Sequence, residues 1–191
     1  MMDWPARPHG GFRVCYIDPA WAFSTYSDKG LEKSPQQHYP CMSLEEMKSW
    51  RVPELMAKDS ACFMWATFPM LPEALELLAH YGFDYRTGGA WAKRSSTGQK
   101  WAFGTGYIFR GAAELLLVGV RGKPTWLSKS ERNLWVAPIR EHSRKPDEVR
   151  QMIERLCPGP RLELNARTAT PGWVAHGNEV DKFPADLGDV L

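Results

Sequence analysis

The segment Val14-Cys15-Tyr16-Ile17-Asp18-Pro19-Ala20-Trp21 places an acid, a proline and an aromatic residue directly after an apolar run. An apolar run of this length, rich in β-branched and aromatic residues, predicts a buried strand, which we expect over Phe12–Ile17. The four residues after it would form a loop at the carboxyl end of the strand. Because proline restricts the backbone there, the acid and the neighbouring carbonyl would be held in fixed positions.

A fixed carboxylate beside a fixed carbonyl suits the exocyclic amine of adenine. The lone pair of that nitrogen is delocalised into the ring, so the nitrogen is a poor nucleophile until it is held out of conjugation. Asp18 would accept one N–H and the Pro19 carbonyl the other, while Trp21 would offer a face or wall for the base. The alternative is an ordinary strand exit, because Asp-Pro commonly opens a turn and Trp is usually a core residue. The four residues alone leave both interpretations open.

Apolar runs alternate with amphipathic segments along the rest of the chain. Further strands are predicted at Ala61–Ala66, Tyr85–Ala92, Leu115–Val120, Leu134–Ile139 and Leu162–Ala166. Helices are predicted at Ser43–Trp50, Leu71–Tyr81 and Pro146–Leu156, with a helical turn or two after Gly106. This alternation predicts an α/β fold with a mostly parallel sheet and helices on both faces. At 191 residues the chain is expected to be a single domain over residues 1–191, with its core at about 12–181.

Ligands of such sheets bind beyond the carboxyl ends of the strands. Asp18 follows the first predicted strand, the segment 91–93 closes the third, and the segment 165–167 closes the last. We therefore expect these three segments to face one crevice. The sequence Gly104-Thr105-Gly106 lacks the third glycine of a dinucleotide fingerprint, so a nicotinamide cofactor has little support.

Positive charge is concentrated in the middle of a chain whose net charge is +2. The segment from Lys93 to Arg132 carries eight Lys and Arg residues against two Glu residues, with aromatic residues among them. A nucleic-acid groove uses this combination for phosphates and unstacked bases, and Lys93, Arg94 and Lys100 are the cations we expect to bind substrate. A solvated face above buried aromatic residues is the alternative, and the segment alone does not separate the two.

Other classes of protein have little support in the sequence. The four cysteines and five histidines lack the spacing of a zinc or redox site, so we expect no metal. The longest apolar runs fall far short of the ~20 residues that a membrane helix needs. The amino terminus lacks the apolar core of a secretory signal, and we therefore expect a cytoplasmic protein that does not bind a membrane.

Several further motifs follow the first one in order and with compact spacing. They are Tyr39-Pro40-Cys41-Met42-Ser43, Phe103-Gly104-Thr105-Gly106-Tyr107, Glu114-Leu115-Leu116-Leu117, the block 140–148, Leu162-Glu163-Leu164-Asn165-Ala166-Arg167, Pro171-Gly172-Trp173 and Gly177-Asn178-Glu179. On these motifs the chain, from about Val14 to Val180, resembles the adenine N-6 methyltransferase family. That family includes the catalytic subunit of the eukaryotic messenger-RNA adenosine methyltransferase and many bacterial and phage DNA adenine methylases.

The resemblance implies a Rossmann-like fold that uses S-adenosylmethionine, with the catalytic motif before the cofactor strand. The residues implied as catalytic are Asp18, Pro19, Ala20 and Trp21, and Tyr39 is implied to lie near the target base. The residues implied to surround the cofactor are Ile17, Asp18, Lys145, Glu163, Leu164, Arg167, Asn178 and Glu179. Among these, a lysine or arginine would pair with the methionine carboxylate, and Glu163 or Glu179 would take the ribose hydroxyls.

The implied substrate is adenine in a nucleic acid, for which we expect DNA, with RNA as the alternative. Two positions depart from the family pattern, because Ala20 stands where a second proline is usual and Asn165 where Phe is usual. These departures put the rate and the substrate in doubt. The family also contains inactive partner subunits, so a non-enzymatic scaffold is the alternative of another class. A compact domain without a separate recognition domain could also need a second copy or a partner subunit to grip nucleic acid.

Overall fold

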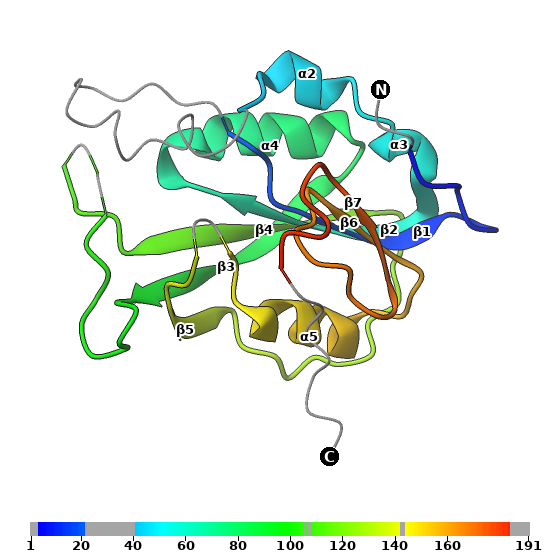
Figure 1. The fold of residues 1–191 in the computed structure, drawn as a ribbon. Helices are drawn as coiled ribbons and strands as arrows, with labels where there is room; N and C mark the ends of the chain where they lie inside the picture. Colours follow the sequence, from blue (N-terminus) through cyan, green and yellow to red (C-terminus); the bar gives the residue numbers. More distant parts are fainter. Residues whose placement is uncertain (1–3, 22–40, 105, 107, 142–143, 184–191) are drawn as a thin grey trace.

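A seven-stranded sheet in the order β5-β3-β4-β2-β1-β6-β7 runs through the part of the chain that the structure describes (Figure 1). The structure, a computed structural model, describes residues 4–21, 41–104, 106, 108–141 and 144–183. The strands are β1 (Phe12–Ile17), β2 (Met56–Ala66), β3 (Asp84–Arg94), β4 (Ala113–Arg121), β5 (Leu134–Pro138), β6 (Arg161–Leu164) and β7 (Trp173–His176).

All of these strands except β4 run in the same direction. Strand β1 is parallel to β2 and β6, β6 is parallel to β7, and β3 is parallel to β5. Strand β4 lies between β2 and β3 and is antiparallel to both. The mostly parallel sheet predicted from the sequence is confirmed, with one reversed strand inside it. The reversal brings the first residues of β4 to the edge at which its neighbours end.

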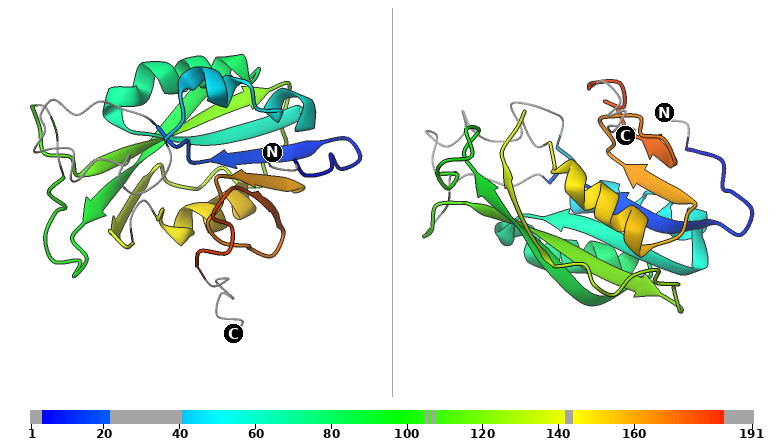
Figure 2. Two further views of the ribbon diagram at one scale, coloured as in Figure 1. Left: turned by 45° about the horizontal axis from the view of Figure 1, so that its top comes forward. Right: turned by 90° about the horizontal axis from the view of Figure 1, so that it is seen from below.

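Helices cover both faces of the sheet, as predicted (Figures 1 and 2). Helices α2 (Leu44–Lys48), α3 (Val52–Leu55) and α4 (Leu71–His80) lie on one face, where the 3-10 turn η2 (Phe68–Met70) precedes α4, and α5 (Asp147–Leu156) lies on the other. The alternation of side chains along β1 supplies both cores. Cys15 and Ile17 are buried on the α4 side, whereas Val14 and Tyr16 are buried on the α5 side.

Local sequence explains where the helices begin. The Ser43 hydroxyl accepts a hydrogen bond from the Glu46 backbone, and the Glu46 carboxylate accepts one from the Ser43 backbone at 2.7 Å, which together form the capping box of α2. In α5 the apolar residues Val149, Met152 and Ile153 recur at helical spacing and are buried against the sheet. None of the helices in the described ranges is long and apolar enough to cross a membrane.

Two segments differ from the sequence-based expectation. The described residues of the segment 95–112 contain no helical turn after Gly106. They form a loop in which the Gly104 N–H donates to the Gly111 carbonyl at 2.9 Å. Strand β7 was not predicted, because four residues with no apolar alternation give no periodic pattern. Its pairing with β6 decides its conformation, and β6 is therefore flanked on both sides.

Candidate active site

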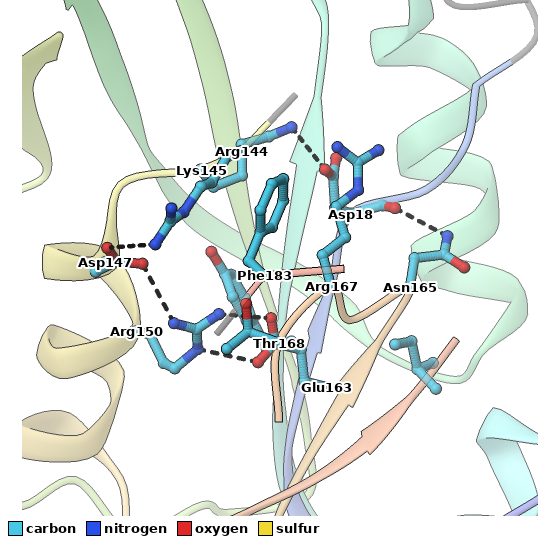
Figure 3. Close-up of a pocket in the computed structure, with 12 residues that line it drawn as sticks. Asp18, Arg144, Lys145, Asp147, Arg150, Glu163, Asn165, Arg167, Thr168 and Phe183 are labelled. Carbon is cyan, nitrogen blue, oxygen red and sulfur yellow. Dashed lines mark hydrogen bonds and ion pairs between the residues drawn. The ribbon is translucent and has the colours of Figure 1, made fainter. Parts of the chain in front are cut away.

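The ends of β1 and β6 meet at the carboxyl edge of the sheet. Ile17 pairs with Leu164, so the residues that follow them, Asp18 and Asn165, lie side by side. The Asn165 side-chain amide donates to the Asp18 backbone carbonyl at 2.9 Å (Figure 3). Asn165 has a φ of 56°, a left-handed conformation that asparagine adopts more readily than most residues. Asn165, one of the two residues that depart from the family pattern, therefore holds the exit of β1 in place.

This role of Asn165 can be tested by two substitutions at the same position. We expect Asn165→Ala to lower the free energy of unfolding by about 2 kcal/mol, because it removes the hydrogen bond and puts alanine at a positive φ. Asn165→Gly removes the same hydrogen bond but suits the backbone, so its cost should be smaller, about 1 kcal/mol. Urea denaturation measures both, and equal losses would show that the left-handed conformation contributes nothing.

A row of alternating charges leads from Asp18 across this edge. The Lys145 Nζ lies 2.7 Å from Asp18 Oδ2 and 3.3 Å from Glu114 Oε2. On the far side, the Lys93 Nζ lies 2.5 Å from Glu114 Oε1. The Asp18 side chain is 27% exposed and that of Lys145 only 11%, so these ion pairs are largely shielded from water. Two cations and two carboxylates thus form one connected group beside the β1 exit.

Glu114 is the residue of this group that the sequence analysis did not place in the site. A residue at the start of a parallel strand would lie at the opposite edge of the sheet. Because β4 is reversed, Leu115 pairs with Ala66, the last residue of β2, and Glu114 reaches the carboxyl edge. The sequence offered only one hint, an acid at the start of an apolar run, and that hint does not give the direction of the strand.

The two carboxyl groups of this row differ in their tendency to ionise. Burial raises the pKa of Asp18, and the nearby Glu114 charge adds to this effect against the opposing charge of Lys145. Burial also acts to raise the pKa of Glu114, but Lys145 and Lys93 outweigh it and hold that pKa below its ordinary value. Glu114 is therefore the fixed anion, and Asp18 is the carboxyl whose protonation state its neighbours can alter.

Two cavities border Asp18. The first lies between the exit of β6 and the start of α5, and its lining includes Arg144, Lys145, Glu163, Leu164 and Phe183 (Figure 3). The lining of the second includes Pro19, Ala20, Asn178 and Glu179. Asp18, Asn165 and Arg167 line both cavities. The structure thus brings together most of the residues that the resemblance implied for the cofactor site.

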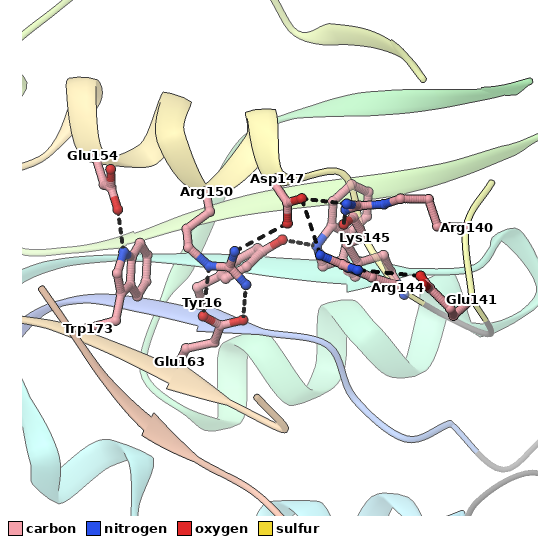
Figure 4. Close-up of polar contacts among 11 residues, drawn as sticks. Tyr16, Arg140, Glu141, Arg144, Lys145, Asp147, Arg150, Glu154, Glu163 and Trp173 are labelled. Carbon is pink, nitrogen blue, oxygen red and sulfur yellow. Dashed lines mark hydrogen bonds and ion pairs between the residues drawn. The ribbon is translucent and has the colours of Figure 1, made fainter. Parts of the chain in front are cut away.

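Glu163 lines the first cavity but is already engaged there. Arg150 donates from Nε and Nη2 to the two Glu163 oxygens, both at 2.9 Å, and the Glu163 side chain is 9% exposed and that of Arg150 14% (Figure 4). Arg150 also lies 3.4 Å from Asp147 within α5, and its pair with Glu163 ties α5 to β6. Burial raises the pKa of Glu163 in spite of Arg150. Glu179, by contrast, pairs with Arg167 at 3.2 Å and is more exposed than Glu163.

Two residues implied by the resemblance line neither cavity. The Ile17 side chain is wholly buried in the core. The Trp21 ring is 5% exposed, packs on the α4 side of the sheet and donates from Nε1 to the Trp65 carbonyl at 3.3 Å. Trp21 therefore anchors the loop, and its expected role as a face or wall for the base stays a prediction. Trp91 is buried as well, so the third expected segment reaches the edge through Lys93.

Backbone hydrogen bonds hold the loop between Asp18 and Trp21 in place. The Trp21 N–H donates to the Pro19 carbonyl at 2.8 Å, and the Met42 N–H donates to the Ala20 carbonyl at 2.9 Å. The Pro19 carbonyl therefore keeps one lone pair for a further donor, since a carbonyl oxygen has two. Tyr39, expected near the target base, lies outside the described residues.

The basic middle segment of the chain does not form one continuous track. Lys93 and Arg94 end β3, and Lys100 follows in the next loop, at the same edge as Asp18. Arg121 ends the reversed β4 and donates to the Tyr81 carbonyl, at the opposite edge. The three cations expected to bind substrate therefore lie at the edge of Asp18, whereas Arg121 lies at the other edge.

Comparison with known proteins agrees with this geometry. The MT-A70 family profile matches residues 12–179, which is most of the chain and includes every element from β1 to β7. The chain belongs to the MT-A70 family. The resemblance read from the sequence motifs is therefore confirmed, and the mixed α/β sheet is the Rossmann-like fold of the MT-A70 methyltransferases.

MT-A70 relatives differ in how much of their length this chain covers. The chain is 32% identical over 177 residues to the N(6)-adenosine-methyltransferase subunit METTL3 of Danio rerio and 33% identical over 176 residues to the N(6)-adenosine-methyltransferase MT-A70-like of Arabidopsis thaliana. Each alignment covers 90% of this chain but only 28% and 24% of those relatives. It is also 29% identical over 195 residues to the type II methyltransferase M.MunI of Mycoplasma sp, covering 92% of this chain and 81% of the relative.

Proposed function

We propose that this MT-A70 protein transfers a methyl group from S-adenosylmethionine to the exocyclic N-6 amine of an adenine in a polynucleotide. The observation that carries the proposal is the place of Asp18, whose carboxylate borders two cavities at the carboxyl edge of the sheet. The Pro19 carbonyl follows it directly, and Lys145 lies 2.7 Å away. The printed names of the N(6)-adenosine-methyltransferase relatives support the same reaction.

The residues around the two cavities fit the chemistry of S-adenosylmethionine. Lys145 and Arg167 suit the carboxylate of its methionine part, while Asn178 and Glu179 suit the ribose hydroxyls. Gly177 lets the segment that carries Asn178 and Glu179 pack closely on the exit of β6, because a Cβ there would come within 3.0 Å of the Ala166 backbone. When bound, the cofactor supplies a methyl group on a positively charged sulfur.

The chain's own residues would prepare the amine. The Asp18 carboxylate accepts one N–H, and the Pro19 carbonyl accepts the other with its remaining lone pair, which turns the nitrogen lone pair out of the ring. Asp18 then accepts the proton that the methylated nitrogen sheds. Burial, which raises its pKa, makes Asp18 a better base for this step than an exposed aspartate.

DNA is the first substrate class we propose. The type II methyltransferase M.MunI is matched over most of its length, and we take this relative to support DNA. The N(6)-adenosine-methyltransferase names of the eukaryotic relatives support RNA as the second candidate. An assay with radiolabelled S-adenosylmethionine on separate DNA and RNA oligonucleotides decides between them. Cofactor binding without transfer to either would instead favour an inactive scaffold subunit.

The proposal includes the compartment in which the protein acts and the subunits that it needs. We place the protein in the cytoplasm, as its sequence leads us to expect. A second copy of the chain or a partner subunit would supply the grip on nucleic acid that a domain of this size lacks. Sedimentation with and without an oligonucleotide shows whether two copies of the chain associate.

The charge row around Asp18 predicts how the rate depends on pH. Transfer requires the Asp18 carboxylate, so the rate should fall as pH falls through a pKa that lies above the ordinary aspartate range. Glu114→Gln removes a charge that raises this pKa and should move the acidic limb to lower pH. Lys145→Met removes a charge that lowers it and should move the limb to higher pH. Single-turnover rates across the pH range measure both shifts.

A distant cation provides the control for these shifts. Arg155 pairs with Glu131 at the end of α5, away from Asp18, so Arg155→Met should leave the acidic limb in place. Shifts of Glu114→Gln and Lys145→Met in the same direction would contradict the assignment of the limb to Asp18.

A further inference from the structure

The loop between β3 and β4 carries a group of large exposed rings and side chains. Its most exposed members are Trp101 at 57%, Phe103 at 80%, Ile108 at 77% and Phe109 at 83%. Apolar side chains of this size normally lose much of their surface to the core. Four of them exposed on one loop indicate a surface that contacts something else.

The base of this loop is fixed to the sheet. The Lys93 N–H donates to the Ala112 carbonyl at 2.8 Å, and the Ala102 N–H donates to the Lys93 carbonyl at 2.9 Å. The same Lys93 forms the ion pair with Glu114, which is linked through Lys145 to Asp18. The exposed rings are therefore carried on a fixed base that adjoins the candidate active site.

The charge of the loop identifies the chemistry that would bind there. Between Arg94 and Ala113 the sequence contains the cations Arg94, Lys100 and Arg110 and no Asp or Glu. Two of the cations lie over rings, with the Arg94 guanidinium 4.3 Å from the centre of Trp101 and that of Arg110 5.3 Å from Phe103. Exposed rings interleaved with positive charge match a strand of unstacked bases with its phosphates.

We infer that this loop is a stacking platform for unpaired bases next to the target adenine. The substrate form that the protein prefers is then a single strand or a locally opened duplex, whether DNA or RNA. A closed duplex cannot use the platform, because its bases have no free faces. This inference rests on the proposed function and adds to it the form of the polynucleotide.

Substituting leucine for the two most exposed rings tests the inference. Phe103→Leu with Phe109→Leu keeps the surface apolar but removes the ring faces. Each lost stacking partner is worth about a five- to 150-fold change in affinity. Because the variant loses two, we expect binding of adenine-containing single strands to weaken by at least about 25-fold, with duplex binding unchanged. Fluorescence anisotropy with single-stranded and duplex oligonucleotides, in DNA and RNA forms, measures the effect.

A matched control lies at the other end of β3. Tyr85 is 50% exposed there, and Tyr85→Leu should leave single-strand affinity unchanged. Thermal melting shows whether each variant is folded. If the variant with both leucines is not folded, Phe103→Ala with Phe109→Ala replaces it in the binding test. Unchanged single-strand affinity in the ring variants overturns the inference. A changed oligomeric state in sedimentation with unchanged affinity also overturns it and assigns the loop to a protein interface.

The activity assay separates this test from the proposed function. If the wild-type protein methylates oligonucleotides and the ring variants bind single strands as tightly, only the platform is wrong. If the wild-type protein methylates none, the proposed function fails whatever the loop binds.

Discussion

Replacing Asp18 with alanine is expected to lower the rate of methyl transfer by about a thousandfold or more, while the affinity for S-adenosylmethionine changes by less than about tenfold. The rate should fall because the amine loses the acceptor that turns its lone pair out of the ring. The affinity should be nearly kept because Lys145 retains Glu114 as a partner at 3.3 Å and so stays in place. Single-turnover rates and calorimetry on the same preparation measure the two effects.

Two further variants make this result specific. Asp18→Asn keeps the shape of the side chain but replaces a charged acceptor with a neutral one, so its rate should lie between those of the wild type and Asp18→Ala. Asp84, at the start of β3, is a strongly exposed aspartate, and Asp84→Ala should leave the rate unchanged. Wild-type activity in Asp18→Ala would remove the proposed role of the loop, because the Pro19 carbonyl alone should not hold the amine.

The largest effect on stability is expected at the buried pair of Arg150 and Glu163. Glu163→Ala leaves the guanidinium of Arg150 without its bidentate partner in a site that is largely shielded from water. Removing one member of a buried pair costs about 3–5 kcal/mol, and we expect a loss of this size in the free energy of unfolding. Chemical denaturation of the purified variant measures it.

Replacing both members of the pair provides the control. Burial raises the pKa of Glu163 even though Arg150 opposes it, so the carboxylate is held ionised at a cost. The double variant Arg150→Met with Glu163→Leu removes both charges and should recover most of the lost stability. A double variant as unstable as Glu163→Ala would show that the pair contributes specific structure that apolar packing cannot replace.

The core elements of the fold could be predicted because their sequences carry periodic patterns. The strand at Phe12–Ile17 was predicted with the bounds that it has, and the helices near α4 and α5 were predicted to within one or two residues. Strand β7 could not be predicted, because it is short and its conformation depends on pairing with β6. The direction of β4 could not be predicted either, because an apolar run has the same pattern in both directions.

The candidate site likewise contains residues that the sequence predicted and residues whose place depends on tertiary structure. The resemblance implied that Asp18, Lys145, Arg167 and Asn178 surround one site. In the structure Lys145 lines one cavity and Asn178 the other, and Asp18 and Arg167 line both. Glu114 was missed because its place depends on the reversal of β4. Trp21 is buried, as the alternative of an ordinary core residue expected, and its role as a face or wall for the base stays a prediction. The positions of Glu114 and Trp21 depend on tertiary contacts, which the residue types alone do not give.

The position of the transferred methyl group shows whether the protein methylates the N-6 amine of adenine and whether Asp18 is needed. The protein is incubated with S-adenosylmethionine and adenine-containing DNA and RNA oligonucleotides, and the digested products are separated by mass spectrometry against nucleoside standards. We expect N6-methyladenine from the wild-type protein and none from Asp18→Ala. Methylation of another base or another adenine nitrogen, or N6-methyladenine formed equally by Asp18→Ala, would contradict this expectation.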